Sequence, residues 1–451
     1  MKILKIISCV LCTIIVIFSF NSRLNIDNQS EYYIGIKNIL IEKKHHLRDS
    51  DIKIGEVAYS PICLQSPDSN QQSLNKTLAL NGDYLVVSDP EANEILVYRH
   101  KTEEGWVTIA KIKPPKESFA EKRGYGFGYG LAINNNIIAI SSYNYKYYSP
   151  IYVFNRSKRL DYELFTATID TNFDTVALQQ LSLPEELQIV SPMSLERVAF
   201  YYTELEFVDQ KIALLGKNRI ESNDNNYIFL INPVTSEIDK NIKLPNLPSQ
   251  SPRLYANNKS LFLFYTWSPL KHRSIYTVED GKLIDNVFDE RLVDAIFDSQ
   301  VVSDFQKLSL TRVAISNNLI TLVLSTMPFR SNATIIFKPY SQKFSSGKTY
   351  QHGLVDARDP LVLISVLSDH PIMGNKSFDH FLFEANENEV IVKSQISWER
   401  YEKDEIGSYI PTKGVIASDS LIVSAYGAVI SLPLKNLPEV YKIKPSICRS
   451  K

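Results

Sequence analysis

The chain has 451 residues, of which 44% are hydrophobic and 22% are charged, and its formal net charge is -1 at pH 7. This composition is typical of a globular protein with a large core. The near-zero charge offers no attraction to nucleic acid or to an anionic membrane surface, so no nucleic-acid partner is expected. Tyr (25) and Phe (21) are abundant, and aromatic residues favour strands over helices.

The N-terminus has the pattern of an export signal, although a buried N-terminal strand or helix is the alternative. Lys2 and Lys5 precede an uncharged apolar run over residues 6–20. A run of about fifteen residues is short for a spanning helix and typical of the apolar core of a signal peptide. Because no clear small-residue cleavage site follows, residues 1–22 are expected to be either a cleaved signal peptide or an uncleaved anchor. The protein is therefore predicted to be secreted, periplasmic or tethered to a membrane.

The rest of the chain divides into a polar segment and a repeat region. Residues 23–53 are polar and charged, and we interpret them as a linker. From about residue 74 an apolar strand, a turn of Asn, Asp or Gly and a second apolar strand recur. These turn residues tolerate the positive φ of tight hairpins. Seven copies occur, at residues 78–87, 131–140, 205–214, 254–263, 313–322, 382–392 and 415–423.

A third strand follows most copies, with room for a fourth. The candidate third strands are residues 95–98, 151–154, 227–231, 274–278, 334–337 and 428–432. One four-stranded meander leaves apolar faces uncovered, whereas a ring of meanders covers them. We therefore predict an all-β fold, a single β-propeller of about seven four-stranded blades, over residues 54–448. Residues 170–195 and 289–307 are interpreted as insertions or as long connections between blades.

The first two copies resemble FG-GAP repeats, which build the integrin α-chain propeller and occur in many secreted bacterial proteins. Residues 126–133 are similar to the F-G-x-[SG]-[LV]-A start, and residues 81–90 to the D-G-D-x-L-V-V-G-A-P segment. The resemblance covers about residues 77–160, and no copy has a true G-A-P. It implies an integrin α-like propeller at the cell surface or outside the cell.

The same family often carries a calcium loop of the form D-x-[DN]-x-[DN]-G, whose oxygens converge on one cation. Asp89, Glu91 and Asn93 come closest to it, but the glycine and the downstream carboxylate are missing. The alternative is a solvated acidic turn. Calcium is the one cofactor that the sequence suggests, and no other is expected.

Motifs for catalysis are absent from the sequence. There is no G-x-S-x-G, no H-E-x-x-H and no P-loop. The glycines of residues 124–130 precede a strand, so they predict a tight turn rather than a phosphate site. The Asp369-His370 and Asp379-His380 pairs lack a third partner for acid–base work. No catalytic residue is predicted.

Two classes of function remain open. The first is an extracytoplasmic, non-catalytic binding or scaffold protein that presents a propeller rim to a protein or glycan partner. Its candidate contact residues are Tyr143, Tyr145, Tyr147 and Tyr148, which alternatively pack between blades. The second is an exported hydrolase or lyase with an active site in the central channel. Three or more carboxylates or histidines converging on that channel would favour the enzyme.

The two ends of the propeller are expected to meet. Val57-Ala58-Tyr59 is a candidate strand to pair with residues 440–443, since such pairing removes two open sheet edges. Outside the apolar segment the cysteines are Cys63 and Cys448. An even pair in an exported chain suggests a disulfide, which would clasp the ring. The alternative is two unpaired thiols.

Overall fold

The computed structural model describes parts of the chain between Ile62 and Ile443. The described residues are 62–65, 77–90, 92–124, 126–143, 162–183, 187–189, 205–218, 226–244, 251–256, 260–266, 275–279, 282–285, 308–316, 320–326, 332–338, 343–349, 354–369, 376–385, 390–398, 414–425 and 428–443. The predicted export segment, the linker and Cys448 lie outside them, so the predicted domain boundaries stay predictions.

The described strands form seven antiparallel meanders, as predicted. Blade 1 consists of β2 (Thr77–Asn81), β3 (Tyr84–Asp89), β4 (Glu94–Lys101) and β5 (Gly105–Ile112). Blade 2 consists of β6 (Phe127–Asn134), β7 (Ile137–Tyr143), β8 (Tyr162–Asp170) and β9 (Thr175–Gln180). Blade 3 consists of β11 (Leu205–Val208), β12 (Lys211–Asn218), β13 (Asn226–Ile231) and β14 (Ile238–Lys243), with β10 (Leu187–Ile189) beside β12.

The remaining four blades continue the pattern. Blade 4 consists of β15 (Ser251–Ala256), β16 (Leu261–Thr266), β17 (Ile275–Glu279) and β18 (Lys282–Asp285). Blade 5 consists of β19 (Leu308–Ile315), β20 (Ile320–Thr326), β21 (Asn332–Lys338) and β22 (Lys343–Thr349). Blade 6 consists of β23 (Leu354–Arg358), β24 (Leu361–Asp369), β25 (Lys376–Ala385) and β26 (Val390–Trp398). Blade 7 consists of β27 (Val415–Ile416), β28 (Ser420–Ala425), β29 (Ala428–Pro433) and β1 (Ile62–Gln65).

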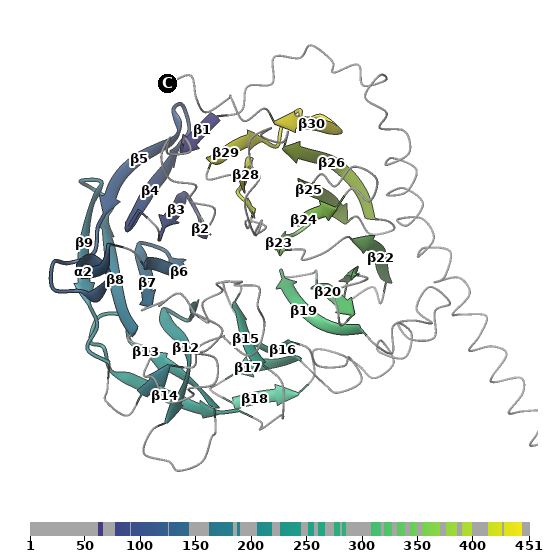
Figure 1. Ribbon diagram of the computed structural model, residues 1–451. Coiled ribbons are helices and arrows are strands. Elements are labelled where there is room, and N and C mark those ends of the chain that lie inside the picture. The colour runs from purple at the N-terminus through teal and green to yellow at the C-terminus, as the bar shows by residue number, and fades with distance from the viewer. Residues whose placement is uncertain are drawn as a thin grey trace, which may run out of the picture.

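The blades form a closed ring, which Figure 1 shows face-on. The first strands of successive blades lie innermost and contact one another in order, and β27 of the last blade contacts β2 of the first. The fold is therefore a single seven-bladed β-propeller. The apolar core lies largely between blades: Val86 and Ile95 of blade 1 pack with Phe127 and Ile138 of blade 2. This arrangement covers both faces of each sheet, which a single meander cannot do.

Both ends of the described chain contribute strands to the last two blades. β1 pairs antiparallel with β29, with Cys63 opposite Ile430, and completes blade 7. β30 (Val440–Ile443) leaves blade 7 and pairs in parallel with β26 of blade 6. The N-terminal strand β1 thus closes the ring through β29, while residues 440–443 pair with β26. The predicted strand Val57-Ala58-Tyr59 lies outside the described residues, so its pairing with residues 440–443 stays a prediction. Without β1, blade 7 has three strands and β29 is its open edge. β30 instead covers the edge strand β26 of blade 6.

Three further predictions about the repeats need correction. Residues 382–392 are the hairpin of β25 and β26, whereas the first hairpin of blade 6 is β23 and β24. The two hairpins have similar sequences, because each joins largely apolar strands through a polar turn. The third strand of blade 2 is β8, and the predicted residues 151–154 lie outside the described part of the chain. Residues 170–180 form the outer hairpin of blade 2 rather than an insertion, and residues 289–307 are not described.

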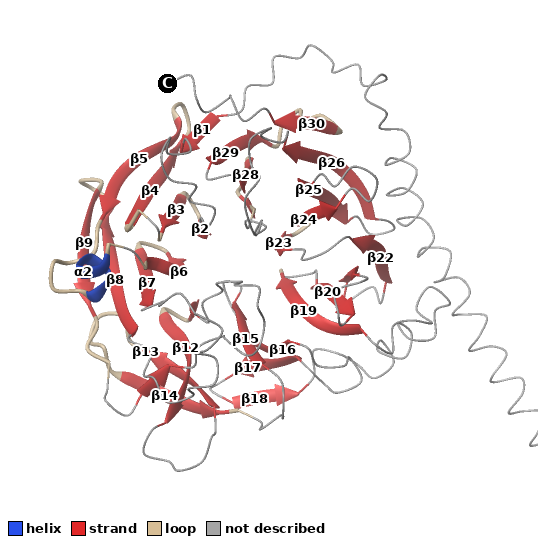
Figure 2. Ribbon diagram, in the orientation of Figure 1, coloured by secondary structure: helices blue, strands red, loops and turns tan. Residues whose placement is uncertain are grey.

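The meander separates two kinds of connection onto opposite faces of the ring. Because strand direction alternates, the turns after the first and third strands of each blade share one face. We call it the tight-turn face, and a bond from Asn135 N to Asn81 Oδ1 (3.3 Å) joins two of its turns. The opposite, long-connection face receives the ends of the longest connections, residues 113–126, 144–161, 286–307 and 399–414. Figure 2 shows how short the described loops are beside the strands.

Candidate binding face

A short helix covers the junction of blades 1 and 2 on the long-connection face. The helix α2 (Phe119–Arg123) begins at Ser118, whose hydroxyl accepts a bond from Glu121 N, and ends at Gly124 in the left-handed conformation (φ 76°). Serine is a usual start signal of a helix, and glycine is a usual stop signal. No helix was expected at these residues, although Ser118 and Gly124 mark both of its ends.

Asn93 fixes α2 to the turn between β3 and β4. This buried residue has a φ of 54°. Its side-chain amide donates to Ala120 O (2.6 Å), and its Oδ1 accepts from Phe127 N (3.0 Å). Asp89 is also buried, and its Oδ1 accepts from Ala92 N (3.1 Å). Two of the three calcium candidates therefore have structural partners; Glu91 lies outside the described residues.

Glycine allows blade 2 to approach blade 1 closely. At Gly128 (φ +82°) an added Cβ would lie 2.8 Å from Ser88 Cβ and 3.0 Å from Ile95 Cδ1. The Ser88 hydroxyl donates to Gly128 O (2.5 Å), and Gly126 N donates to Pro90 O (2.7 Å). The glycine-rich segment therefore forms a tight connection, as predicted, and the close contact is with the neighbouring blade.

The predicted tyrosine run begins beside α2. Tyr143 is the last residue of β7 and lies opposite Tyr162, the first residue of β8. The next residue, Glu163, accepts a bond from Phe119 N at the start of α2 (3.2 Å). Tyr145, Tyr147 and Tyr148 lie outside the described residues, within the connection 144–161 that leaves and returns at this point. The helix and the two strand ends that this connection joins, Tyr143 and Tyr162, therefore lie on one face.

The histidine of the second Asp-His pair is a core residue. His380 lies in β25, and its Nδ1 is 2.8 Å from the hydroxyl of Ser365, which is also buried. Burial lowers the pKa of His380 to about 3. His380 is therefore a buried residue with Ser365 beside it, and the side chain of Asp379 is not among those described. His370 is not described.

Neither a metal cluster nor a membrane helix occurs in the described part of the chain. Among those residues, no group of three or more His, Cys, Asp or Glu side chains is placed to hold a metal ion. No helix in the same ranges is long and apolar enough to cross a membrane. Residues 6–20 lie outside these ranges.

Comparisons with known proteins return similar structures only. No family model matches the chain, and no curated protein matches it in sequence. The β-propeller domain of the Trilobed protease from Pyrococcus furiosus is 11% identical, with a TM-score of 0.39, and the match covers 81% of this chain and 92% of that one. Oligogalacturonate lyase from Vibrio parahaemolyticus is 10% identical, with a TM-score of 0.43 and coverage of 83% and 92%.

A third similar structure is the periplasmic gluconolactonase of Pseudomonas aeruginosa. It is 11% identical, with a TM-score of 0.40, and the match covers 71% of this chain and 84% of that one. At such low identities and scores these similarities carry no argument about activity. The propeller assignment rests on the order and contacts of the strands.

Proposed function

We propose that this protein is an extracytoplasmic, non-catalytic binding or scaffold protein whose long-connection face contacts a protein or glycan partner. The observation that carries the proposal is that the longest connections between strands all begin and end on that one face. Loops on a rigid scaffold vary without loss of the fold and commonly carry binding residues. The described turns of the opposite face are short.

The tyrosines strengthen the choice of this face. The connection that contains Tyr145, Tyr147 and Tyr148 starts at Tyr143, beside α2. Tyrosine combines a large apolar surface with a polar hydroxyl and loses little conformational entropy on binding, which suits both protein and glycan partners.

A binding experiment on the full chain tests the proposal. The chain is labelled and applied to a glycan array and to the surface of the cells that produce it. We expect saturable binding that falls at least tenfold when Tyr145, Tyr147 and Tyr148 are changed together to Ala. A matched control changes the exposed Thr102 and Ser418 of the tight-turn face to Ala and retains binding. Equal binding by both variants contradicts the proposal. Time-dependent release of product from a bound glycan would favour a hydrolase or lyase instead.

The location outside the cytoplasm rests on the N-terminal pattern of Lys2, Lys5 and the apolar residues 6–20. External protease should degrade the protein in intact cells or in cells with a permeabilised outer envelope. A full-length chain found soluble in the cytoplasm would overturn this part of the proposal.

We also propose that blades 1 and 2 are FG-GAP-type repeats. The contact of Gly128 with Ser88 supports this, because a side chain at the glycine of the F-G segment would collide with Ser88 of blade 1. Calcium at Asp89, Glu91 and Asn93 is the associated proposal. Calorimetric titration with CaCl2 tests it: binding should be lost in Asp89→Asn and kept in the control Asp83→Asn. If titration of the unsubstituted chain gives no heat of calcium binding, these residues only stabilise the turn.

A further inference from the structure

Two exposed apolar side chains lie on corresponding hairpin tips of the tight-turn face. Phe173, between β8 and β9, is 76% exposed, and Val234, between β13 and β14, is 65% exposed. They are the large hydrophobic side chains most exposed among the described residues. Both hairpins join the third and fourth strands of their blades, in blades 2 and 3, so both tips lie on one face.

Each tip is held in one conformation by its own first residue. Asp170 Oδ1 accepts from Asn172 N (2.9 Å) and Phe173 N (3.4 Å). In the next blade, Asn232 Oδ1 accepts from Val234 N (2.9 Å) and Thr235 N (3.2 Å). Such side-chain bonds to following amides stabilise tight turns. A left-handed residue then completes each hairpin, Asp174 (φ 50°) in blade 2 and Ser236 (φ 66°) in blade 3.

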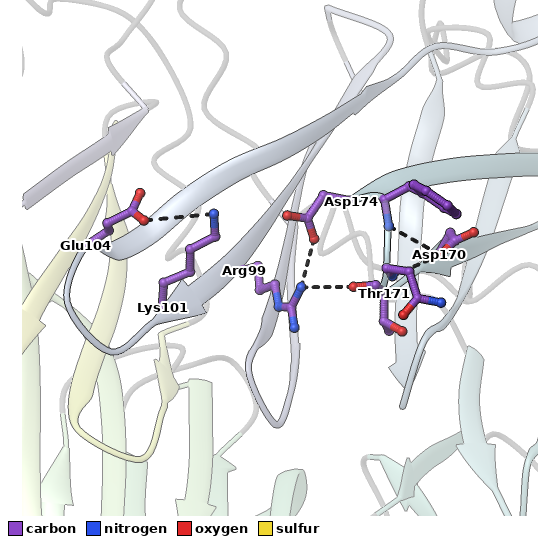
Figure 3. Close-up of polar contacts among 8 residues, drawn as sticks. Arg99, Lys101, Glu104, Asp170, Thr171 and Asp174 are labelled. Atoms are coloured by element: carbon purple, nitrogen blue, oxygen red, sulfur yellow. Dashed lines mark hydrogen bonds and ion pairs between the residues drawn. The ribbon is translucent and has the colours of Figure 1, made fainter.

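The preceding blade fixes each tip from outside. Arg99 of blade 1 donates through Nη1 to Thr171 O (3.2 Å) and to Asp174 Oδ1 (2.9 Å), as Figure 3 shows. Thr166 of blade 2 donates to Pro233 O (3.2 Å) in the same way. A surface held in its bound conformation loses less entropy on association. Exposed apolar side chains on prearranged turns are therefore suited to anchor a partner.

The charges around the tips define the chemistry of that partner. The turns of blades 1 to 3 and the strand ends beside them are rich in acidic residues, namely Asp83, Glu103, Glu104, Asp170, Asp174, Asp209 and Glu237. Basic residues there are fewer, and ion pairs engage three of them: Arg99 with Asp174, Lys101 with Glu104, and Lys211 with Asp239. An acidic surface repels anionic lipid, nucleic acid and a second copy of itself. It attracts a protein surface with basic side chains around an apolar pocket.

We propose that the tight-turn face of blades 2 and 3 docks a protein partner of this kind, with Phe173 and Val234 as apolar anchors. Hot-spot residues of interfaces are often such aromatic side chains, surrounded by a polar rim. This inference concerns the face opposite the proposed long-connection site and does not depend on that site.

Photo-crosslinking of the full chain in the cells that produce it tests the inference. The photoreactive amino acid p-benzoylphenylalanine replaces Thr235, beside Val234, and adducts are identified by mass spectrometry. We expect one protein adduct whose crosslinked peptide is rich in Lys and Arg. In the same chain, Phe173→Asp should lower the adduct yield at least tenfold, whereas Phe173→Leu should keep most of it. Raised salt should lower the yield as well, because charge attraction is screened.

Four outcomes would overturn the inference. They are a lipid adduct, an adduct to a second copy of this chain, equal yields in Phe173→Asp and Phe173→Leu, and no adduct at all. Circular dichroism of both Phe173 variants checks that the ring is folded, and an exposed turn residue of this kind is expected to leave it intact.

Discussion

Trp106 and Ser420 are 314 positions apart in the sequence, yet the indole N–H of Trp106 donates to the hydroxyl of Ser420 at 3.1 Å. Trp106 belongs to β5 of blade 1, and Ser420 begins β28 of blade 7. Beside them, His100 Nε2 lies 3.1 Å from Asp419 Oδ2. The bond therefore joins the first blade to the last and stabilises the closed ring.

Trp106→Phe should weaken this closure. The change removes the donor and part of a buried ring, so we expect a loss of about 2–4 kcal/mol in the free energy of unfolding. Urea unfolding measures it. A double-mutant cycle with Ser420→Ala isolates the bond, and a coupling energy near zero would show that the bond contributes nothing to the closed ring.

Gly128→Ala should destabilise the contact between blades 1 and 2. The new Cβ meets Ser88 at 2.8 Å, and the positive φ adds backbone strain, together about 2–4 kcal/mol. Gly82→Ala is the matched control, because Gly82 also has a positive φ (+56°) but no atom within 4 Å of the added Cβ. It should cost about 1 kcal/mol. Equal urea midpoints for the two variants would refute the steric explanation.

His380 should make the fold sensitive to acid. Its folded-state pKa is about 3, lowered by burial from the ordinary 6.5. Between these two pKa values the histidine is protonated in the unfolded chain and neutral in the folded chain. The free energy of unfolding therefore decreases as pH falls from 6.5 towards 3. The slope from this group is about 1.4 kcal/mol per pH unit. His380→Asn, which keeps a partner for Ser365, should flatten the dependence of the urea midpoint on pH in this window. An unchanged slope would assign the acid sensitivity to other groups.

Cys63 and Cys448 should form a disulfide. Cys63 packs against the cluster between blades 6 and 7 that also buries Ile443, the last residue of β30. Cys448 follows soon after along the chain, outside the described residues. Non-reducing peptide mapping should find the two cysteine peptides joined. In the chain-entropy model such a long loop stabilises by about 4–5 kcal/mol, which Cys63→Ser would remove. Alkylation of both thiols in the unfolded, unreduced chain would contradict the prediction.

Local sequence patterns determined the type and number of the blades. Residues 78–87 and 131–140 each contain two short apolar runs around a turn of Asn, Gly or Asp, and these residues form the first hairpins of blades 1 and 2. Strand propensity, side-chain alternation and positive φ at turns act within a few residues, so a single sequence contains them. For the same reason Gly128 was recognisable as part of a tight connection, although its contact with Ser88 was not.

Only the tertiary structure decided which strands meet. The hairpin of residues 382–392 carries the same local pattern as a first hairpin, and only its pairing with β24 places it third and fourth in blade 6. Likewise β1 pairs with β29 rather than with residues 440–443. The pairing of short strands depends on which sheet edge is left open after the blades have packed. The sequences of β1 and of residues 440–443 do not specify that edge. The hairpin tips at Phe173 and Val234 were missed for this reason, since the Arg99 and Thr166 bonds that hold them come from neighbouring blades.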